Sequence, residues 1–132
     1  MIAHSHDLRV YYGDTDAGGV MYYAAYLDFA ERARTEALRA AGLPHAAMVS
    51  EHGVMFMVRR AEIEYQRAAR LDDLVTIRTT TESATGATVT LRQEFSLDGE
   101  TLAVARIMLV CVRTATGGAA RIPARWRDLL AA

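Results

Sequence analysis

The residue types best suited to chemistry lie together near the N-terminus, in the segment Gly13-Asp14-Thr15-Asp16-Ala17-Gly18-Gly19. A long helical pattern begins directly after it, near Tyr22. This order places a carboxylate beside the free backbone N–H groups of a helix N-terminus, and a reacting carbonyl group would fit between the two. Aspartate before glycine also commonly closes a turn, so the residues by themselves leave a purely structural role for Asp14 and Asp16 open.

The composition excludes several classes of function. All fifteen basic residues are arginine, which removes enzymes that need a Schiff-base lysine or a Walker-type phosphate lysine. The formal net charge of -1 and the scattered arginines do not predict the basic patch that a nucleic-acid-binding surface needs. The single cysteine, Cys111, lies in an apolar run and is expected to be a buried structural thiol. No segment is a signal peptide or long enough to cross a bilayer, so we expect a cytoplasmic protein without membrane insertion.

The sequence predicts no metal site. Asp14 and Asp16 imitate the acidic pair of haloacid-dehalogenase-type phosphatases, but those folds need a parallel sheet, a longer chain and usually a lysine. The first two histidines lie in an N-terminal segment expected to be mobile, and the other two flank a connecting segment. None of the four has metal-ligand spacing with a second ligand: His4, His6, His45 and His52. We therefore expect neither a metal nor a redox cofactor.

Hydrophobic periodicity predicts one long helix, from Tyr22 to Ala41. Its apolar stripe consists largely of alanine, which would let a sheet approach closely, and Gly42 is placed to end it. A short first strand is predicted before it, at Leu8–Gly13, because of the Val-Tyr-Tyr content there. A helical turn at His45–His52 and a terminal helix at Pro123–Leu130 complete the helical segments.

The second half of the chain predicts antiparallel strands. Period-two alternation predicts three of them, at Ala61–Gln66, Val75–Arg78 and Val89–Leu97. An apolar run predicts a fourth at Leu102–Val112, which we expect to be covered on both faces through oligomer contacts. Asp98-Gly99 is the strongest hairpin signal. This order predicts an α+β layer of one helix against one sheet in a single domain, residues 1–132. Two architectures fit the order equally well, the hotdog fold and the cystatin-like cone.

A resemblance decides between them. The segment Tyr11–Val20, continued by Tyr26 and by Glu31–Glu36, closely resembles the opening of the hotdog-fold acyl-CoA thioesterases. Within these it is similar to the group that contains 4-hydroxybenzoyl-CoA thioesterase and the Tol-Pal-associated thioesterases of bacteria. The resemblance continues at Arg59–Tyr65 and Ala69–Asp73, so it covers most of the chain. It implies a hotdog fold, in which a five-stranded antiparallel sheet wraps one long central helix.

The resemblance also implies a reaction, hydrolysis of an acyl-CoA or aroyl-CoA thioester, with coenzyme A entering only as part of the substrate. Asp16 would be the catalytic carboxylate, acting either as nucleophile or as general base on water. Backbone N–H groups around Tyr23 would hold the oxyanion. Gly18 and Gly19 would let the ligand approach the backbone, and Tyr12 is a weaker candidate for the pocket wall.

Two further points concern the substrate. Many Tol-Pal-associated members carry histidine where this chain has Tyr23, whereas the hydroxybenzoyl-type enzymes resemble this chain in having tyrosine. Tyr23 is therefore expected to act as a backbone donor. Arg59 and Arg60 are candidate contacts for the coenzyme A phosphates, because arginine binds phosphate in a bidentate manner, with solvated strand charges as the alternative.

Alternatives from other functional classes stay open. A hotdog hydratase or dehydratase acting on acyl thioesters usually needs a histidine with the acid, and the helix start has none. A non-catalytic module binding acyl-CoA or another small ligand would keep the pocket and lose the base, whereas this chain retains Asp16. The family also implies a homodimer or homotetramer, in which two subunits pair their sheets and build each site between them.

Overall fold

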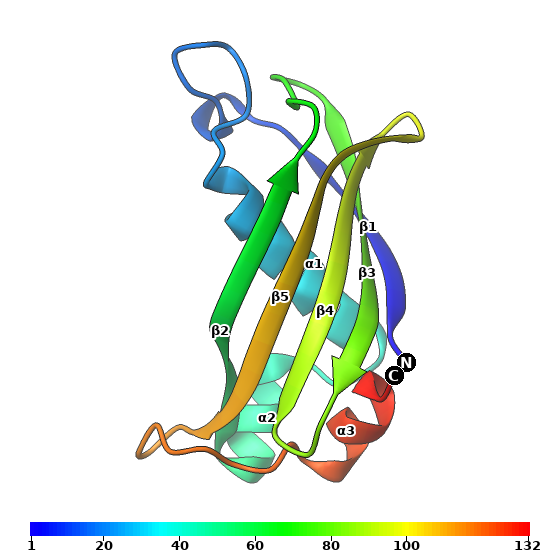
Figure 1. Cartoon of the computed structure of the whole chain (residues 1–132). Coiled ribbons are helices and arrows are strands. Elements are labelled where there is room, and N and C mark those ends of the chain that lie inside the picture. The colour runs from blue at the N-terminus through cyan, green and yellow to red at the C-terminus, as the bar shows by residue number, and fades with distance from the viewer.

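The computed structural model describes residues 1–132 and contains one antiparallel sheet wrapped around a central helix (Figure 1). The five strands follow the order β1-β3-β4-β5-β2 across the sheet. Their bounds are β1 Ala3–Arg9, β2 Val54–Tyr65, β3 Leu74–Ala84, β4 Thr88–Leu97 and β5 Glu100–Arg113. The helices are α1 Ala25–Ala40, α2 His45–His52 and α3 Ala124–Leu130, after a short 3-10 turn, η1, at Tyr12–Asp14.

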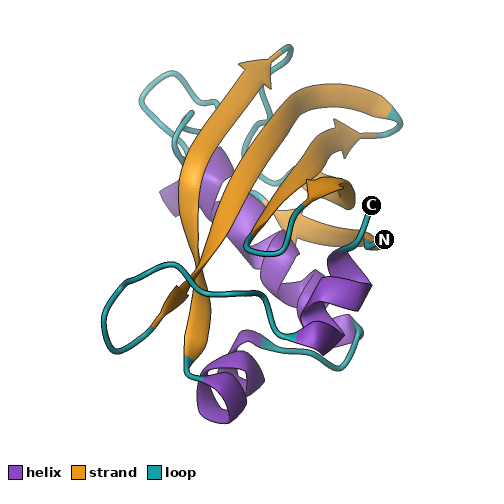
Figure 2. Ribbon diagram, turned by 60° about the horizontal axis from the view of Figure 1, so that its bottom comes forward, coloured by secondary structure: helices purple, strands orange, loops and turns teal.

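Helix α1 lies against one face of the curved sheet (Figure 2). The predicted alanine stripe forms this contact, since Ala30 and Ala33 are fully buried. The helix begins at Ala25 and not at Tyr22, because the N–H of Ala25 donates to the Tyr22 carbonyl in a tight turn that precedes the regular helix. It ends as predicted, with Gly42 at a φ of +75°.

The predicted first strand is wrong. The observed strand β1 is Ala3–Arg9, paired with β3, so His4 and His6 lie in an edge strand and not in a mobile segment. The chain leaves the sheet at Val10, whose N–H donates to the Asp73 carbonyl. Strand propensity suggested a strand at Val-Tyr-Tyr, but pairing with β3 selects the polar alternating segment before it, which suits a half-exposed edge.

Strand β5 is also placed differently from the expectation. It lies between β4 and β2 inside the sheet, so both of its edges are paired within the chain. One of its faces is buried, whereas Val104, Met108 and Val110 on the other face are only partly buried. Strand β2 begins at Val54, earlier than the alternation at Ala61 indicated, and forms one free edge. The Asp98-Gly99 hairpin is confirmed, with both residues at positive φ, and Cys111 is fully buried as predicted.

The segment between β1 and α1 lies at one end of the sheet, and α2 and α3 lie at the other (Figure 1). No helix has the length and apolar character needed to span a membrane. The two ends of the sheet are therefore covered by different segments of the chain.

The buried alanines predict sensitivity to side-chain size. Ala33→Leu should lower the free energy of unfolding by about 1–3 kcal/mol, because extra methyl groups have no space between α1 and the sheet. Ala40→Leu is the matched control on the same helix, where the side chain is exposed, and should change it by no more than about 0.5 kcal/mol. Urea unfolding at one protein concentration measures both, and equal stabilities would contradict the close helix-to-sheet packing.

Candidate active site

The loop around Asp16 is closed by its own hydrogen bonds. The backbone N–H of Asp16 donates to the Val20 carbonyl at 3.0 Å, and the N–H of Gly19 donates to the Asp16 carbonyl at 3.1 Å. The carboxylate oxygen Oδ1 of Asp16 accepts the N–H of Gly18 at 2.9 Å. Gly19 has a φ of +79°, which a residue with a side chain would adopt only with strain. One carboxylate oxygen is thus fixed, and the side chain as a whole is exposed.

Asp14 has a different task. Its carboxylate oxygen Oδ2 accepts the N–H of Tyr11 at 2.9 Å, and its carbonyl accepts the N–H of Tyr22 at 2.8 Å. Both contacts shape the turn into α1. The two aspartates therefore have separate partners, and no group of three or more His, Cys, Asp or Glu side chains is arranged to hold a metal ion.

The start of α1 supplies free donors beside this loop. The backbone N–H groups of Tyr23 and Ala24 have no acceptor within the protein. Unpaired N–H groups and the helix dipole together favour negative charge at this position. The Tyr23 side chain is exposed and its ring lies 4.8 Å from that of Tyr22. Side-chain hydrogen bonding and charge interaction with Tyr23 raise the pKa of Tyr22, and the nearby Asp16 charge adds to the shift.

A second chain segment anchors the loop. The N–H of Met21 donates to the Ala69 carbonyl at 2.7 Å, and the N–H of Ala69 donates to the hydroxyl of Tyr26 at 3.2 Å. Val20 also forms a bridge with Arg70. The loop is therefore fastened both to the connection between β2 and β3 and to the first turn of α1.

Tyr65 contributes to the site, although the sequence assigned it no role. Its hydroxyl donates to the Tyr23 carbonyl at 2.8 Å, and its ring packs edge-on against Tyr26 at 5.1 Å. Burial raises the pKa of Tyr65, with smaller contributions from Tyr26 and Tyr23, so the hydroxyl stays protonated and able to donate. The available signal was its position at the inward-facing end of an alternating strand.

The remaining predicted contacts are dispersed. Tyr12 lies on η1 and not on a strand, and its side chain is 83% exposed, so it forms no pocket wall in the single chain. Arg59 and Arg60 lie in the middle of β2, where a β-bulge interrupts the register, and both are exposed. They are five to six residues from Tyr65, roughly 16–20 Å along the strand. The structure thus places Asp16, Gly18 and Gly19 in one loop that leads into Tyr23, and it leaves these arginines apart.

Comparison with known proteins gives this geometry a context. The sequence matches the thioesterase-like superfamily over residues 10–131. The chain belongs to this superfamily. It is 42% identical over 108 residues to the acyl-CoA thioesterase YbgC of Haemophilus influenzae, a match that covers 82% of this chain and 79% of that protein. It is 28% identical over 120 residues to the 1,4-dihydroxy-2-naphthoyl-CoA hydrolase of Synechococcus elongatus, covering 90% of this chain and 88% of the hydrolase.

A solved structure supports the fold. The probable thioesterase from Bartonella henselae superposes with a TM-score of 0.87 at 34% identity and covers 92% of this chain and 99% of its own. The predicted hotdog fold and the predicted family of thioesterases are confirmed. The enzyme class expected from the sequence, a thioester hydrolase, is confirmed with them.

The Asp16 loop predicts a position-specific effect for glycine. A Cβ added at Gly18 would lie 3.2 Å from Oδ1 of Asp16, whereas one added at Gly13 meets nothing within 4 Å. Gly18→Ala should therefore displace the carboxylate and lower the rate of thioester hydrolysis about tenfold, while Gly13→Ala changes it less than about twofold. Steady-state kinetics on both purified variants checks this. Equal rates would show that the position of the Asp16 carboxylate does not limit turnover.

Proposed function

We propose that this thioesterase hydrolyses a short-chain or aromatic acyl-CoA, with Asp16 as the catalytic carboxylate. The observation that carries the proposal is the exposed Asp16 carboxylate, oriented by Gly18, in the loop that leads into the free N–H groups of Tyr23 and Ala24. The YbgC relatives act on acyl-CoA, and the Synechococcus hydrolase acts on an aromatic acyl-CoA. Both classes of substrate are therefore proposed for this chain.

The reaction needs few groups. In the general-base form, the carboxylate of Asp16 takes a proton from water while the water oxygen bonds to the thioester carbon. The carbonyl oxygen becomes an oxyanion, which accepts hydrogen bonds from the N–H groups of Tyr23 and Ala24. When the carbonyl re-forms, the C–S bond breaks and coenzyme A leaves as a thiolate. A thiol with a pKa of about 8.5 leaves without general-acid help, so the chain needs no histidine here.

In the nucleophilic form, an Asp16 oxygen bonds to the thioester carbon, the thiolate leaves, and water then hydrolyses the mixed anhydride. The oxygen Oδ2 has no protein partner and is available for either role. Gly18 and Gly19 carry no side chains that would block the approach of the thioester. Tyr12, beside the loop, is proposed as part of the wall once the site is enclosed.

Enclosure requires a second subunit, and we propose a homo-oligomer built on the β2 edge. The Asp16 side chain and the Tyr23 ring are both exposed in the single chain. Strand β2 leaves Met57 and Val58 47% and 51% exposed along an unpaired edge, whereas the other edge, β1, is largely polar. Because a free edge with exposed apolar side chains pairs readily with another strand, the apolar first half of β2 makes it the better place for a copy of the chain.

Replacing the carboxylate tests the catalytic role. Asp16→Asn keeps an oxygen that accepts the Gly18 N–H, so the loop should fold, but an amide is neither base nor nucleophile. We expect the rate of thiol release from acyl-CoA and aroyl-CoA esters to fall at least about 100-fold. Asp14→Asn is the matched control, since Asp14 shapes the turn, and it should change the rate less than about twofold.

Three outcomes inform the mechanism. An active, folded Asp16→Asn variant would refute the role of Asp16. A folded wild type that releases no thiol from any ester would favour a binding or a hydratase role. A rapid burst of thiol equal to the enzyme concentration would identify Asp16 as the nucleophile, because it reports an accumulating acyl-enzyme.

The proposed β2 interface predicts an effect of charge on assembly. Val58→Lys should dissociate the oligomer, because a lysine on an edge strand opposes pairing, and activity should fall about tenfold or more as the site opens to water. Ser5→Lys places the same charge on the exposed β1 edge and should change neither property. Light scattering gives the mass of each variant. A monomeric, fully active wild type would exclude the shared site.

A further inference from the structure

The two free N–H groups at the start of α1 belong to two consecutive peptide units. A trans peptide is planar, so its carbonyl and its N–H point in opposite directions, and a partner that holds the carbonyl also sets the direction of the N–H. The chain contains no cis peptide bond. The direction in which Tyr23 and Ala24 present their N–H groups is therefore decided on the other side of each peptide, by the partners of the Tyr22 and Tyr23 carbonyls.

The first of these peptides is held by the backbone. The Tyr22 carbonyl accepts the N–H of Ala25 at 2.9 Å, in the turn that precedes the regular helix. This contact sets the direction of the Tyr23 N–H, and no side chain takes part in it. The first donor is therefore a property of the turn itself.

The second peptide is held by a side chain. In a regular helix the N–H of Leu27 would donate to the Tyr23 carbonyl, but here it donates to the carbonyl of Ala24 at 3.1 Å, and no other backbone N–H replaces it. The hydroxyl of Tyr65 donates to the Tyr23 carbonyl instead, at 2.8 Å. A carbonyl oxygen only accepts, so the hydroxyl proton lies in this contact. Tyr65 thus fixes the peptide that carries the Ala24 N–H.

Tyr65 is itself held from two sides. It is the last residue of β2, and the N–H groups of Gln66 and Arg67, which follow it, both donate to the Leu102 carbonyl, at 2.8 and 3.0 Å. Its ring packs edge-on against that of Tyr26, with 5.1 Å between the ring centroids. The sheet and the helix together therefore set the position of the hydroxyl, which does not depend on the Asp16 loop.

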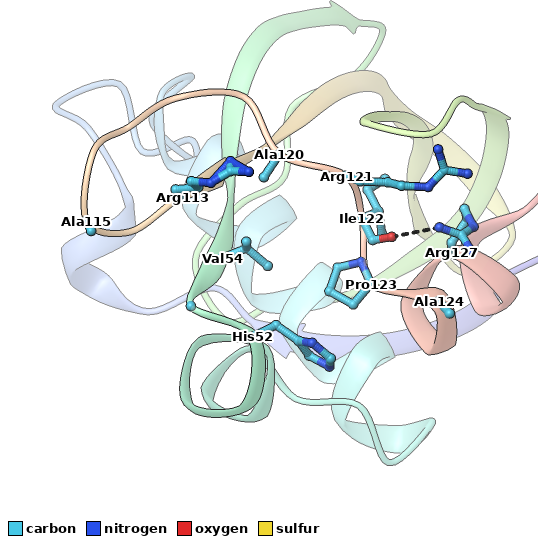
Figure 3. A pocket seen from close by; sticks show the side chains of 11 residues that line it. His52, Val54, Arg113, Ala115, Ala120, Arg121, Ile122, Pro123, Ala124 and Arg127 are labelled. Carbon is cyan, nitrogen blue, oxygen red and sulfur yellow. Dashed lines mark hydrogen bonds between the residues drawn. The ribbon is translucent and has the colours of Figure 1, made fainter.

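A hydrogen bond from a side chain to a carbonyl does not always act on a donor. In the hollow at the other end of the molecule, Arg127 donates to the Ile122 carbonyl at 3.1 Å, as the dashed line in Figure 3 shows. The next residue is Pro123, which has no N–H, so this contact fixes only the course of the chain. After Tyr23 the next residue is Ala24, whose N–H is unpaired. Of the two contacts, only the one at Tyr23 is able to act on a substrate.

We propose that Tyr65 is a positioning residue of this thioesterase, whose hydroxyl acts through the Tyr23 carbonyl to direct the Ala24 N–H at the oxyanion of the reacting thioester. A peptide whose carbonyl accepts a hydrogen bond is also polarised, which makes its N–H a stronger donor. The inference rests on the proposed function, in which the N–H groups of Tyr23 and Ala24 hold the oxyanion. Because the carbonyl oxygen of the substrate gains its charge only in the transition state, Tyr65 contributes mainly to kcat.

Removal of one hydroxyl tests the proposal. Tyr65→Phe keeps the ring against Tyr26 and removes the donor. We expect kcat for acyl-CoA to fall about tenfold while KM changes less than about twofold, because a loosened N–H weakens the transition state more than the neutral substrate. Tyr11→Phe is the matched control, since its side chain is 69% exposed, and it should change neither constant. Thermal unfolding and light scattering show whether both variants fold and assemble like the wild type. An unchanged kcat in folded Tyr65→Phe overturns the proposal.

A second substrate tests whether the hydroxyl acts through the oxygen of the substrate carbonyl. In a dithioester, sulfur replaces that oxygen, and sulfur accepts hydrogen bonds only weakly. The advantage in kcat of the thioester over the dithioester should therefore be several-fold smaller in Tyr65→Phe than in the wild type, because the variant has loosened the donor that distinguishes the two atoms. The same ratio in both enzymes means that the hydroxyl acts only on the stability of the loop, and overturns the proposal.

NMR separates failure of this inference from failure of the proposed function. In protein labelled with ¹³C and ¹⁵N, the resonances of the Tyr23 carbonyl and of the Ala24 N–H should both shift in Tyr65→Phe and in neither case in Tyr11→Phe. Resonances that do not shift overturn the inference, even when the wild type hydrolyses thioesters. Shifted resonances together with an unchanged kcat show the contact and overturn its role in turnover. A wild type that hydrolyses no thioester overturns the proposed function, and this inference with it.

Discussion

The proposed chemistry of this protein depends on how backbone hydrogen bonds fix the Asp16 loop to the start of α1. The Asp14 carbonyl accepts the N–H of Tyr22, so the chain turns sharply and enters the helix with the next N–H groups unpaired. A capping side chain at position 24 would accept the N–H of Tyr26 or Leu27, and Ala24 provides none. The free N–H groups of Tyr23 and Ala24 come before that first turn of the helix. The sharp turn into the helix is therefore what leaves these two donors available for a substrate oxygen.

Such a loop needs a rigid support, because its polar groups are exposed and water competes for them. The support comes from three aromatic rings, of which Tyr26 and Phe95 are buried and Tyr65 is partly exposed. Tyr26 packs against Tyr65 and Phe95, and its hydroxyl accepts the N–H of Ala69, the residue whose carbonyl holds Met21. The same tyrosine thus belongs both to the apolar core and to the hydrogen-bond network of the loop. Core packing is in this way connected to the position of the Asp16 carboxylate.

The sequence predicted the elements whose determinants are local. The alanine stripe of α1, its end at Gly42 and the Asp98-Gly99 hairpin each depend on a few neighbouring residues. The predicted position of strand β1 was wrong because this segment is polar and forms a strand only by pairing with β3, which is far away in the sequence. The Asp16 loop was found through resemblance, since two aspartates and two glycines alone also describe an ordinary turn.

The sequence alone could not predict the contacts of the site that depend on strand register. Tyr65 reaches Tyr23 only because β2 ends beside the helix start, which no local pattern encodes.

The arginines are a second example of what the sequence alone could not predict. A net charge of -1 and scattered arginines argue correctly against binding a long polyanion, which needs a continuous basic surface. A small ligand with a few phosphates needs only two or three guanidinium groups in one hollow. Whether an arginine can serve is decided by its neighbours in space: Arg106 is neutralised by Glu82, whereas Arg121 forms no ion pair. The distribution of charge in the folded chain, and not its sum, determines which anions the protein can bind.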